Sequence, residues 1–508
     1  MQIICRVFFI VLVGLFSFAD ILHAQFNSPL GRDISLSVEH DMNTSGEVFF
    51  SSWHPYLQEH VTQASSTALT WNAPQKTNQS WWSRKFFNEN LFIRQDSGYM
   101  IFLDPVFDFS YGKESTTNRN LFVNSRGVRA GGRLGEHFAF ETEIYENQSI
   151  LPSHVDNFVN QWRVVPGQGS ARRYKKTGRD YSNVSGYISW SPSQSQNLQF
   201  GHGKHFVGDG YRSLLLSDNS FAYPYIKYTC TLGRWQYVRT VASLMNITSR
   251  SSDSEEFPKK TAGFDYLTVD IGRRIQISLF EGNIWANPDS TKRFKPSFGV
   301  FNPIILTNTL FTSGREDMHS LLGLNVKCLV NKNIVLYGQV MFDDIMNTTK
   351  NAGIQMGAKY FDVMGLPGLF LQAEINQMEN GAYSYVRNTG ISYVHYNQTI
   401  AHPLGNNFKE MVAIASYSFR KFRFEYRLNI AEERESGIIP PKEFAVYTGE
   451  KKVVFNHIQA AWIMNQRNTM QLIAGYTDRN ESSSVNPLHT GSFFIAFRTV
   501  LRNHYYDF

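Results

Sequence analysis

One glycine-rich stretch combines histidine, lysine and aspartate and is the strongest candidate in this sequence for a metal-binding or catalytic site. Gly201-His202-Gly203-Lys204-His205, followed by Asp209, contains side chains that zinc accepts as ligands. The stretch is predicted to be a strand, in which residues an odd number apart point to opposite faces. His202 and His205 therefore cannot bind one metal ion, and polar residues around a strand end explain the stretch better. We expect no metal and no cofactor.

No other motif of established catalytic chemistry is present. The sequence lacks the Gly-x-Ser-x-Gly, His-Glu-x-x-His, phosphate-loop and dinucleotide-binding patterns. We therefore expect a protein that is not an enzyme. A hydrolase that acts at a membrane stays open as an alternative, because serine and histidine both occur on strand faces that would line a lumen.

A basic and aromatic cluster is the second feature that suggests a site. It lies in a loop predicted for residues 147–180, where guanidinium groups suit carboxylates and aromatic faces suit sugar rings. This chemistry predicts an acidic polysaccharide as the ligand. The alternatives are a solvated surface loop and a loop that contacts lipopolysaccharide phosphates. The cluster consists of Trp162, Arg163, Arg172, Arg173, Tyr174, Lys175, Lys176 and Arg179.

Composition limits the class of protein that must position these residues. The chain has 508 residues, of which 15% are aromatic and 18% are charged, and its mean hydropathy is −0.31. A polytopic helical membrane protein would be far more hydrophobic, and a disordered chain would be poorer in aromatic residues. The formal charge of +6 is spread along the chain without a run of Lys and Arg, so we expect no nucleic-acid partner.

The first 24 residues are predicted to be a cleaved secretory signal. Arg6 precedes an apolar run over residues 7–18, and Leu22-His23-Ala24 is a candidate cleavage site. An uncleaved membrane helix is the alternative, but the run is short for that role. No later stretch of about 20 apolar residues occurs, so a membrane protein with this sequence has to be a barrel.

Side chains from residue 96 onward alternate between apolar and polar types. Val128, Ala130 and Leu134 alternate with arginine and glycine, and a turn at Gly135 leads into a second alternating segment. Since successive side chains of a strand point to opposite faces, one face is apolar and the other carries Arg and Glu. In an outer-membrane barrel the apolar face meets lipid and the polar face lines the lumen.

The connections separate a membrane barrel from a soluble β-sandwich. Short turns such as 331–333 and 420–421 alternate with generally longer connections such as 147–180 and 285–318, as they do in bacterial barrels. The predicted fold is therefore an all-β, transmembrane antiparallel barrel of about 18 strands, an even number that places both termini in the periplasm. We expect cross-strand ion pairs in the lumen among Glu141, Glu143, Glu425, Arg129, Arg133, Arg423 and Arg427.

The end of the chain is predicted to form the last strand. The apolar frame from Phe493 to Tyr505 predicts a strand over residues 489–505. A terminal aromatic residue such as Phe508 resembles the signal read by the outer-membrane assembly machinery. Phe508 is out of phase with that frame, so we expect a bulge or an irregular ending.

Residues 25–95 alternate poorly and are predicted to form a unit separate from the barrel of residues 96–508. They contain Trp53, Trp71, Trp81 and Trp82 among many Ser, Thr, Asn and Gln residues. We expect an ordered segment that is either periplasmic or folded into the barrel mouth as a plug. A flexible tail is the alternative, but disordered segments are poor in aromatic residues.

One stretch resembles a known family. Gly208-Asp209-Gly210-Tyr211-Arg212-Ser213-Leu214-Leu215-Leu216-Ser217-Asp218-Asn219 is similar to the Gly-Gly-Arg-Ser-Leu-Leu-Leu-Ser region of the Wzi capsule-assembly family, especially its gliding-motility RemB-like branch. Ala401-His402-Pro403-Leu404 resembles a recurrent segment of that branch. The residues that carry the resemblance are Gly208, Asp209, Gly210, Arg212, Ser213, Ser217, His402 and Pro403.

The resemblance implies an outer-membrane barrel that holds capsular polysaccharide at the cell surface as a lectin, without catalysis. In the gliding branch it implies a role in surface motility or in handling surface polysaccharide. Our leading expectation is a non-enzymatic barrel in the outer membrane of a Gram-negative bacterium, with acidic surface polysaccharide, lipid and lipopolysaccharide as partners. The alternatives are a porin or uptake channel, and an accessory barrel that binds motility or secretion proteins through residues 25–95.

Overall fold

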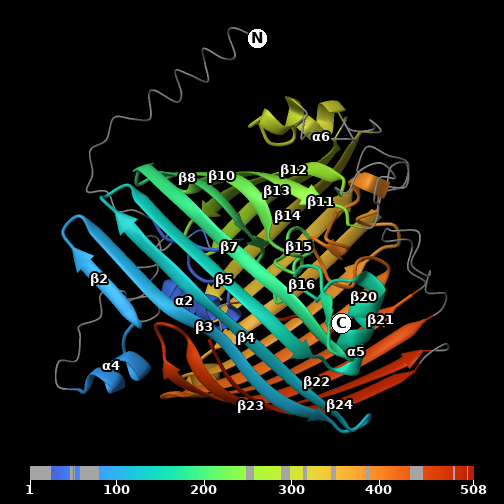
Figure 1. Ribbon diagram of the computed structural model, residues 1–508. Helices are drawn as coiled ribbons and strands as arrows, with labels where there is room; N and C mark the ends of the chain where they lie inside the picture. The colour runs from blue at the N-terminus through green and yellow to red at the C-terminus, as the bar shows by residue number, and fades with distance from the viewer. Residues whose placement is uncertain are drawn as a thin grey trace.

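The alternating segments of the sequence form a closed antiparallel barrel of 18 strands, which confirms the predicted fold class (Figure 1). The computed structural model describes residues 25–45, 50, 52–57, 79–247, 257–287, 298–312, 317–344, 351–384, 389–434, 450–483, 487–499 and 502–508. The predicted signal, residues 1–24, lies outside the described residues. The wall strands are β3 (Tyr99–Glu114), β4 (Arg119–Leu134), β5 (Phe138–Ile150), β7 (Gly178–Ser193), β8 (Gln196–Gly203), β10 (Tyr223–Leu232), β11 (Trp235–Met245), β12 (Lys259–Ile271), β13 (Ile275–Ala286), β14 (Met318–Asn331), β15 (Ile334–Asp343), β16 (Asn351–Phe361), β17 (Leu369–Met378), β20 (Phe408–Phe419), β21 (Phe422–Glu433), β22 (Lys451–Asn465), β23 (Met470–Ser483) and β24 (Leu488–Thr499).

The ring closes where the last wall strand pairs with the first. β24 is antiparallel to β3 and places Phe497 opposite Phe109. Short elements lie around and inside this wall. They are α2 (Arg32–Ser45), β1 (Trp53–His54), α4 (Trp81–Phe87), β2 (Phe92–Asp96), α5 (Ser153–Trp162), β6 (Arg172–Tyr174), β9 (Phe206–Val207), η1 (Phe298–Phe301), α6 (Thr307–Thr312), η2 (Val363–Gly365), η3 (Thr389–Ile391), β18 (Val394–His395) and β19 (Gln398–Thr399).

The two ends of the barrel differ in the length of their connections. At the end that we call the short-turn end, tight hairpins such as residues 233–234 and 420–421 join neighbouring strands. At the opposite end, the long-loop end, residues 151–177, 204–222 and 379–407 connect β5 to β7, β8 to β10 and β17 to β20. β3 begins and β24 ends at the short-turn end, as an even number of strands requires.

The wall has an apolar outer face and a polar inner face. On β17, Leu371 and Ile375 point outward and are 41% and 55% exposed, whereas Glu374 and Asn376 are buried on the lumen side. This alternation follows from the two-residue period of a strand. No helix among the described residues is long and apolar enough to cross a membrane. Other outward apolar side chains are Leu324, Leu336, Phe424, Ile458, Phe493 and Ile495.

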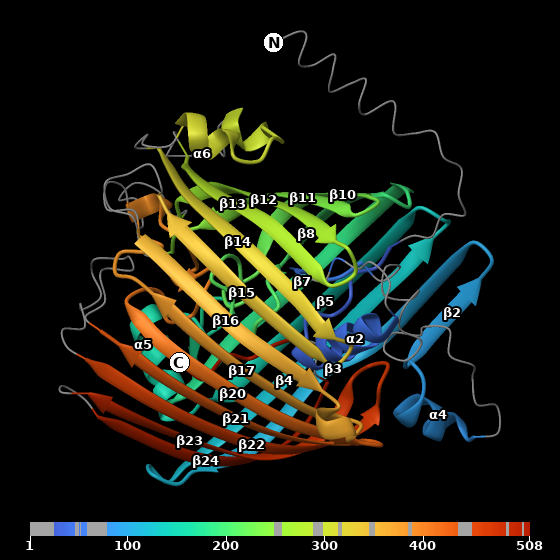
Figure 2. The ribbon, with the colours of Figure 1, turned by 180° about the vertical axis from the view of Figure 1, so that it is seen from behind.

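The N-terminal residues that the structure describes contact the lumen side of the wall. Helix α2 places the Glu39 carboxylate 3.1 Å from the ammonium group of Lys327 on β14 and 2.6 Å from that of Lys359 on β16. Burial alone would raise the pKa of Glu39, but the two ammonium groups lower it below its ordinary value. Further along the chain, β1 pairs with β9 and places Trp53 opposite Val207. Figures 1 and 2 show α2 within the outline of the barrel from both sides.

The end of the chain leaves the wall instead of continuing the last strand. β24 ends at Thr499, and residues 502–508, which we call the tail, run into the lumen, so the strand predicted to reach residue 505 was too long. The Tyr505 hydroxyl donates to Asp218 at 2.9 Å. The Asn503 amide, which would face outward if the strand continued, donates to Asp218 at 3.0 Å. This polar contact explains the early ending, so that of the two predicted alternatives, a bulge or an irregular ending, the structure has the irregular ending.

Candidate functional site

The family-like motif of residues 208–219 lies in the interior of the barrel. It belongs to the connection 204–222, which enters the lumen, and Gly210 lies against the wall strand β17. A Cβ atom at position 210 would lie 2.5 Å from the Glu374 carboxylate. Gly208 has a φ of +128°, and a Cβ atom there would overlap the Gln339 amide. Both positions therefore require glycine.

Arg212 is the centre of a buried charge network. Its guanidinium donates to Glu410 Oε1 of β20 at 3.0 Å and lies 3.2 Å from the carboxylate of Asp507 in the tail. Nε2 of His402 is hydrogen-bonded to the other Glu410 oxygen at 2.9 Å. The Tyr211 hydroxyl donates to Asp507 at 2.7 Å. We call Tyr211, Arg212, His402, Glu410 and Asp507 the lumen network.

The charge balance of the lumen network favours the ionised carboxylate in the tail. Burial would raise the pKa of Asp507, but the guanidinium groups of Arg212 and Arg427 lower it below its ordinary value. Asp507 is 1% exposed and Arg212 is equally buried, so neither charge is hydrated. Each therefore depends on the other, which fixes the tail to the connection 204–222.

The other motif residues also make interior contacts. Asp209 accepts from the Ser52 hydroxyl at 2.7 Å and lies 3.4 Å from the Lys327 ammonium group. The Ser213 hydroxyl donates to the Val207 carbonyl, and the Ser217 hydroxyl accepts from the Asn219 amide. Pro403 follows His402 in the turn that leads to β20. The structure thus brings two distant motif segments together, and it gives them contacts that hold loops, wall and tail in place.

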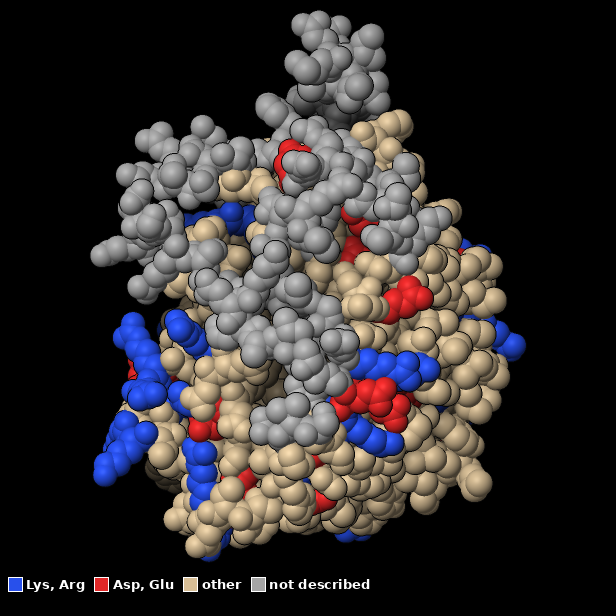
Figure 3. Space-filling view, turned by 90° about the vertical axis from the view of Figure 1, so that its right-hand side faces the viewer, with Lys and Arg blue, Asp and Glu red and all other residues tan. Residues whose placement is uncertain are grey.

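The basic and aromatic cluster forms a hairpin at the long-loop end. β6 pairs with the start of β7, so that Arg172 lies opposite Asp180 and Tyr174 opposite Gly178. Five cationic side chains of this region are exposed, and none of them forms an ion pair with another described residue. Figure 3 shows this end of the molecule, with Lys and Arg gathered along one edge. We call Arg163, Arg172, Arg173, Lys175 and Lys176 the basic hairpin.

Three residues predicted for the same site have structural contacts instead. The Arg179 guanidinium lies 2.7 Å from Asp156 of α5 and is mostly buried. The Trp162 ring is half-buried and packs on Phe158, with ring centroids 6.2 Å apart. Tyr174 is also half-buried, and the Lys175 ammonium group lies 5.1 Å from its ring centroid. These residues support the hairpin, and the five residues of the basic hairpin present its charge.

Helix α5 connects the hairpin region to the tail. His154 Nε2 is hydrogen-bonded to the Tyr506 carbonyl at 3.0 Å, and Nδ1 contacts the Thr490 hydroxyl at 3.3 Å. The Phe158 and Phe508 rings pack with centroids 4.9 Å apart. Burial, with a smaller effect of Arg479, lowers the pKa of His154 to about 3, so this histidine is neutral in the folded protein at pH 7.

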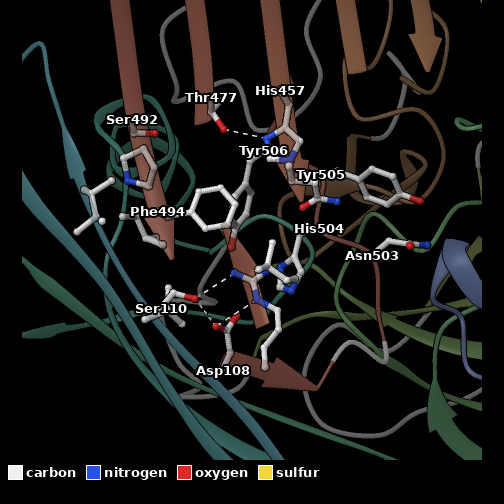
Figure 4. A pocket seen from close by; sticks show the side chains of 18 of the residues that line it. Asp108, Ser110, His457, Thr477, Ser492, Phe494, Asn503, His504, Tyr505 and Tyr506 are labelled. Atoms are coloured by element: carbon white, nitrogen blue, oxygen red, sulfur yellow. Dashed lines mark hydrogen bonds and ion pairs between the residues drawn. The ribbon is translucent and has the colours of Figure 1, made fainter. Parts of the chain in front are cut away.

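A cavity of about 260 Å³ lies between the tail and one side of the wall (Figure 4). Strands β3, β4 and β21–β24 line one side, and Tyr505 and Tyr506 line the other. Sequence analysis did not find this cavity, because residues that lie far apart in the chain form it. The sequence feature that could have indicated the cavity is the pair of arginines on the lumen face of β21, Arg423 and Arg427.

The predicted cross-strand ion pairs are only partly present. Arg129 donates to Glu141 of the neighbouring strand at 2.6 Å, as predicted. Arg423 and Arg427 instead contact the N-terminal segment and the tail: Arg423 pairs with Asp33, and Arg427 lies 3.8 Å from Asp507. The prediction was wrong for these two arginines because neighbouring strands offered the only partners visible in the sequence.

No site with metal-binding or nucleophilic geometry emerges from the stretch 201–205. Nδ1 of His202 is hydrogen-bonded to the Val184 carbonyl at 2.8 Å. His205 is fully buried, and its ring lies edge-on to Tyr225 at a centroid distance of 4.5 Å. Among the residues that the structure describes, no three His, Cys, Asp or Glu side chains are grouped to hold a metal ion.

The fold is similar to those of solved outer-membrane barrels. Wzi of Escherichia coli, described as an outer-membrane protein involved in group 1 capsule assembly and as a carbohydrate-binding β-barrel, has a TM-score of 0.59 at 11% sequence identity, with 94% of this chain and 99% of Wzi covered. OprD and OccK7 (OpdD) of Pseudomonas aeruginosa have TM-scores of 0.43 and 0.46 at 10% and 9% identity, with 78% of this chain and 94% and 98% of theirs covered. No protein-family model matches the sequence, and no curated protein is significantly similar to it in sequence. At this identity the likeness to Wzi shows a shared barrel fold, and the similarity to the gliding-motility branch stays a prediction.

Proposed function

We propose that this chain is an outer-membrane barrel that holds acidic polysaccharide at the surface of a Gram-negative cell. The observation that carries the proposal is the basic hairpin, whose five exposed cations have no ion-pair partner among the described residues. Guanidinium and ammonium groups without a partner in the protein are available to the carboxylates of a ligand. The printed description of Wzi, which shares the fold, as a carbohydrate-binding barrel supports the proposal.

In this proposal the long-loop end faces the outside of the cell. Bacterial barrels have short periplasmic turns and longer outer loops, and both ends of this barrel fit that rule. The apolar outer face suits a lipid environment. The basic hairpin lies in the connection between β5 and β7, at the end that an external polymer meets first. Export through a cleaved signal at residues 1–24 is part of the same proposal.

Binding in this proposal is retention, without turnover of the polymer. One exposed ion pair contributes only about 0.2–1 kcal/mol. A charged polymer meets several cations of the hairpin at once, and its repeats meet the hairpins of many barrels, so the weak contacts combine. This arrangement needs no catalytic group, in keeping with the expectation that the protein is not an enzyme.

The proposal treats the lumen as filled rather than open. Besides α2 and the tail, the connection 204–222 and the described residues 379–384 and 389–407 occupy it, and their apolar side chains form a buried core with the wall. A porin or uptake channel would need a continuous water-filled path through this core. The filled lumen among the described residues therefore favours an anchor over a channel. Buried members of the core are Leu214, Leu215, Phe264, Phe280, Tyr393 and Ile400.

Charge reversal in the basic hairpin tests the proposal. The variant Arg172→Glu, Arg173→Glu, Lys175→Glu and Lys176→Glu is expected to release acidic polysaccharide from cells into the medium, with total synthesis unchanged. The matched control reverses four exposed cations at the short-turn end: Arg234, Arg273, Arg274 and Lys332. Equal retention by both variants, each present in the outer membrane at the wild-type amount, would contradict the proposal.

A role in gliding motility is a further part of the proposal, and it rests on the resemblance of residues 208–219 to the gliding branch. If retained polysaccharide supports movement, the hairpin variant should lose both retention and motility. A variant that loses retention but moves normally would remove this part of the proposal and leave the anchor in place.

A further inference from the structure

The cavity beside the tail has the size of a small ligand site. Its volume of about 260 Å³ is close to the lower limit of about 300 Å³ for small-molecule pockets. It is lined by the inner face of the wall on one side and by residues 502–506 on the other. Figure 4 shows side chains from β3, from β22–β24 and from the tail pointing into the same space.

The guanidinium groups around this cavity have unused hydrogen-bond donors. The Nε–H groups of four lining arginines have no acceptor in hydrogen-bonding geometry among the described residues. Buried donors of this kind are rare in folded proteins and call for an explanation such as a bound ion or ligand. The four residues are Arg32, Arg423, Arg427 and Arg498.

A fifth arginine forms no ion pair with any residue that the structure describes, although the carboxylates of Glu143 and Asp108 act on it from a greater distance. Arg502 lies 4.0 Å from the ring centroid of Tyr145, and it has no carboxylate at ion-pair distance among the described residues. Arg502 also donates a hydrogen bond of 3.4 Å to Gln168. Burial lowers the pKa of Arg502 below its ordinary value, and the charges of Glu143 and Asp108 offset this only in part.

The acidic side chains that line the cavity do not balance these arginines. Asp108 lies 3.4 Å from Arg498, Glu425 lies 3.9 Å from Arg32, and Asp33 pairs with Arg423. Three carboxylates thus face five guanidinium groups in the lining, and a fourth, that of Asp507 just outside it, lies 3.8 Å from Arg427, which leaves one guanidinium group in excess. One further negative charge would fit the cavity electrostatically.

The remaining lining residues suit a sugar ring better than a bare ion. Phe455, Phe494 and Tyr506 offer aromatic faces, on which the apolar face of a pyranose can pack. Ser110, Thr477 and Ser492 supply hydroxyl groups that both donate and accept hydrogen bonds. A ring with a carboxylate and several hydroxyls uses all three kinds of group: guanidinium, aromatic and hydroxyl.

We propose that this cavity binds one uronic-acid unit, with its carboxylate on the guanidinium groups of Arg498 and Arg502 and its ring against Phe494 and Tyr506. The inference rests on the proposed function, because it names an acidic sugar as the class of ligand. It differs in location, since the basic hairpin contacts the polymer outside the barrel and the cavity takes a single unit inside. Bound there, the sugar would also touch the tail.

Calorimetric titration of the full-length protein in detergent micelles tests this inference. Sodium glucuronate is expected to bind saturably, glucose not at all, and inorganic phosphate more weakly than glucuronate. Arg498→Gln and Arg502→Gln should each weaken glucuronate binding about tenfold or more, since each loses a charge-assisted hydrogen bond. Asp108→Asn should strengthen it, because it frees Arg498 from its carboxylate partner. Arg273→Gln at the short-turn end is the matched control and should change nothing.

Several outcomes would overturn the inference. Absence of saturable glucuronate binding is one, and phosphate binding as tight as glucuronate is another. Unchanged binding in both arginine variants is a third. Asp108→Asn guards against misfolding as an explanation, since a damaged cavity cannot bind more tightly. The hairpin charge-reversal variant separates the two proposals: it should keep glucuronate binding while it loses polymer retention, and each of these results can fail without the other.

Discussion

Arg212 and His402 bind the two oxygens of one carboxylate, that of Glu410, although they come from different connections of the barrel. The same guanidinium lies 3.2 Å from Asp507 near the chain end. Four segments therefore meet at one buried set of charges: the connection 204–222, the turn before β20, β20 itself and the tail. Loss of Arg212 would remove the contact that joins the carboxylates of Glu410 and Asp507 in the interior.

Replacing Arg212 by methionine is expected to destabilise the barrel by about 3–5 kcal/mol, because Glu410 and Asp507 would stay buried without their shared counter-charge. The measurement is the urea midpoint of unfolding in micelles, followed by the heat-modifiable shift of the folded band on a gel. Arg273→Met, an exposed site, should stay within about 0.5 kcal/mol of wild type. A midpoint for Arg212→Met equal to that of the control would show that the lumen network does not support the fold.

Replacing Glu39 by glutamine is expected to release α2 from the wall. The substitution leaves the ammonium groups of Lys327 and Lys359 with one neutral partner where they had a carboxylate. Backbone amides of α2 should then exchange hydrogen faster, while amides of β14 and β16 keep their protection. Lys359→Met should have a smaller effect in the Glu39→Gln background than alone, since the two groups interact directly. Independent effects would contradict the contact.

Docking of α5 on the tail is expected to weaken at acidic pH. His154 has a pKa of about 3 when docked, against an ordinary value of 6.5, so between pH 6.5 and pH 3 only the undocked state takes up the proton. Docking is therefore fully favoured above pH 6.5, and each pH unit below it costs up to about 1.4 kcal/mol. Hydrogen exchange in α5, compared at pH 7.5 and pH 4.5, measures this loss. His154→Gln should remove the pH dependence; equal dependence in that variant would assign it to another group.

Deleting residues 502–508 is expected to open a path through the lumen. The tail forms one side of the cavity and closes the space beside β22–β24, and the wild-type barrel should conduct almost no ions in a planar bilayer. The truncated barrel should show discrete conductance steps. A second variant, Tyr505→Ala with Asp507→Ala, keeps the chain end for assembly and should conduct in brief openings. If neither variant conducts ions although both are correctly inserted, α2 and the loops seal the lumen without the tail.

The wall of this barrel is predictable from sequence because its physical cause is local. Each wall strand has to present apolar groups outward and polar groups inward, and the alternation of β17 records this residue by residue. The same rule failed at the chain end. Apolar residues at 501 and 505 keep the frame of β24, but the contacts that hold Tyr505 in the lumen involve Asp218, far away in the chain. A local pattern cannot report such a partner.

The candidate sites also include parts that the sequence predicts and parts that it does not. The exposed charges of the basic hairpin were visible in the sequence, since a loop with clustered Arg and Lys has to leave most of them in solvent. The role of Arg179 was not visible, because its partner Asp156 lies on a helix that the sequence analysis did not predict. The internal cavity was also missed, since the tail that completes it was predicted to lie in the wall.

The tail follows β24 and the N-terminal segment precedes β3, and these two strands form the seam that closes the ring. Described parts of both segments lie in the lumen, and both segments adjoin this seam in the chain order. A ring that closed first would have to thread the tail past loops and a helix already packed inside. Assembly avoids this when the interior condenses while the seam is still open. We therefore expect the pairing of β24 with β3 to be the last step of assembly, after the interior segments have packed.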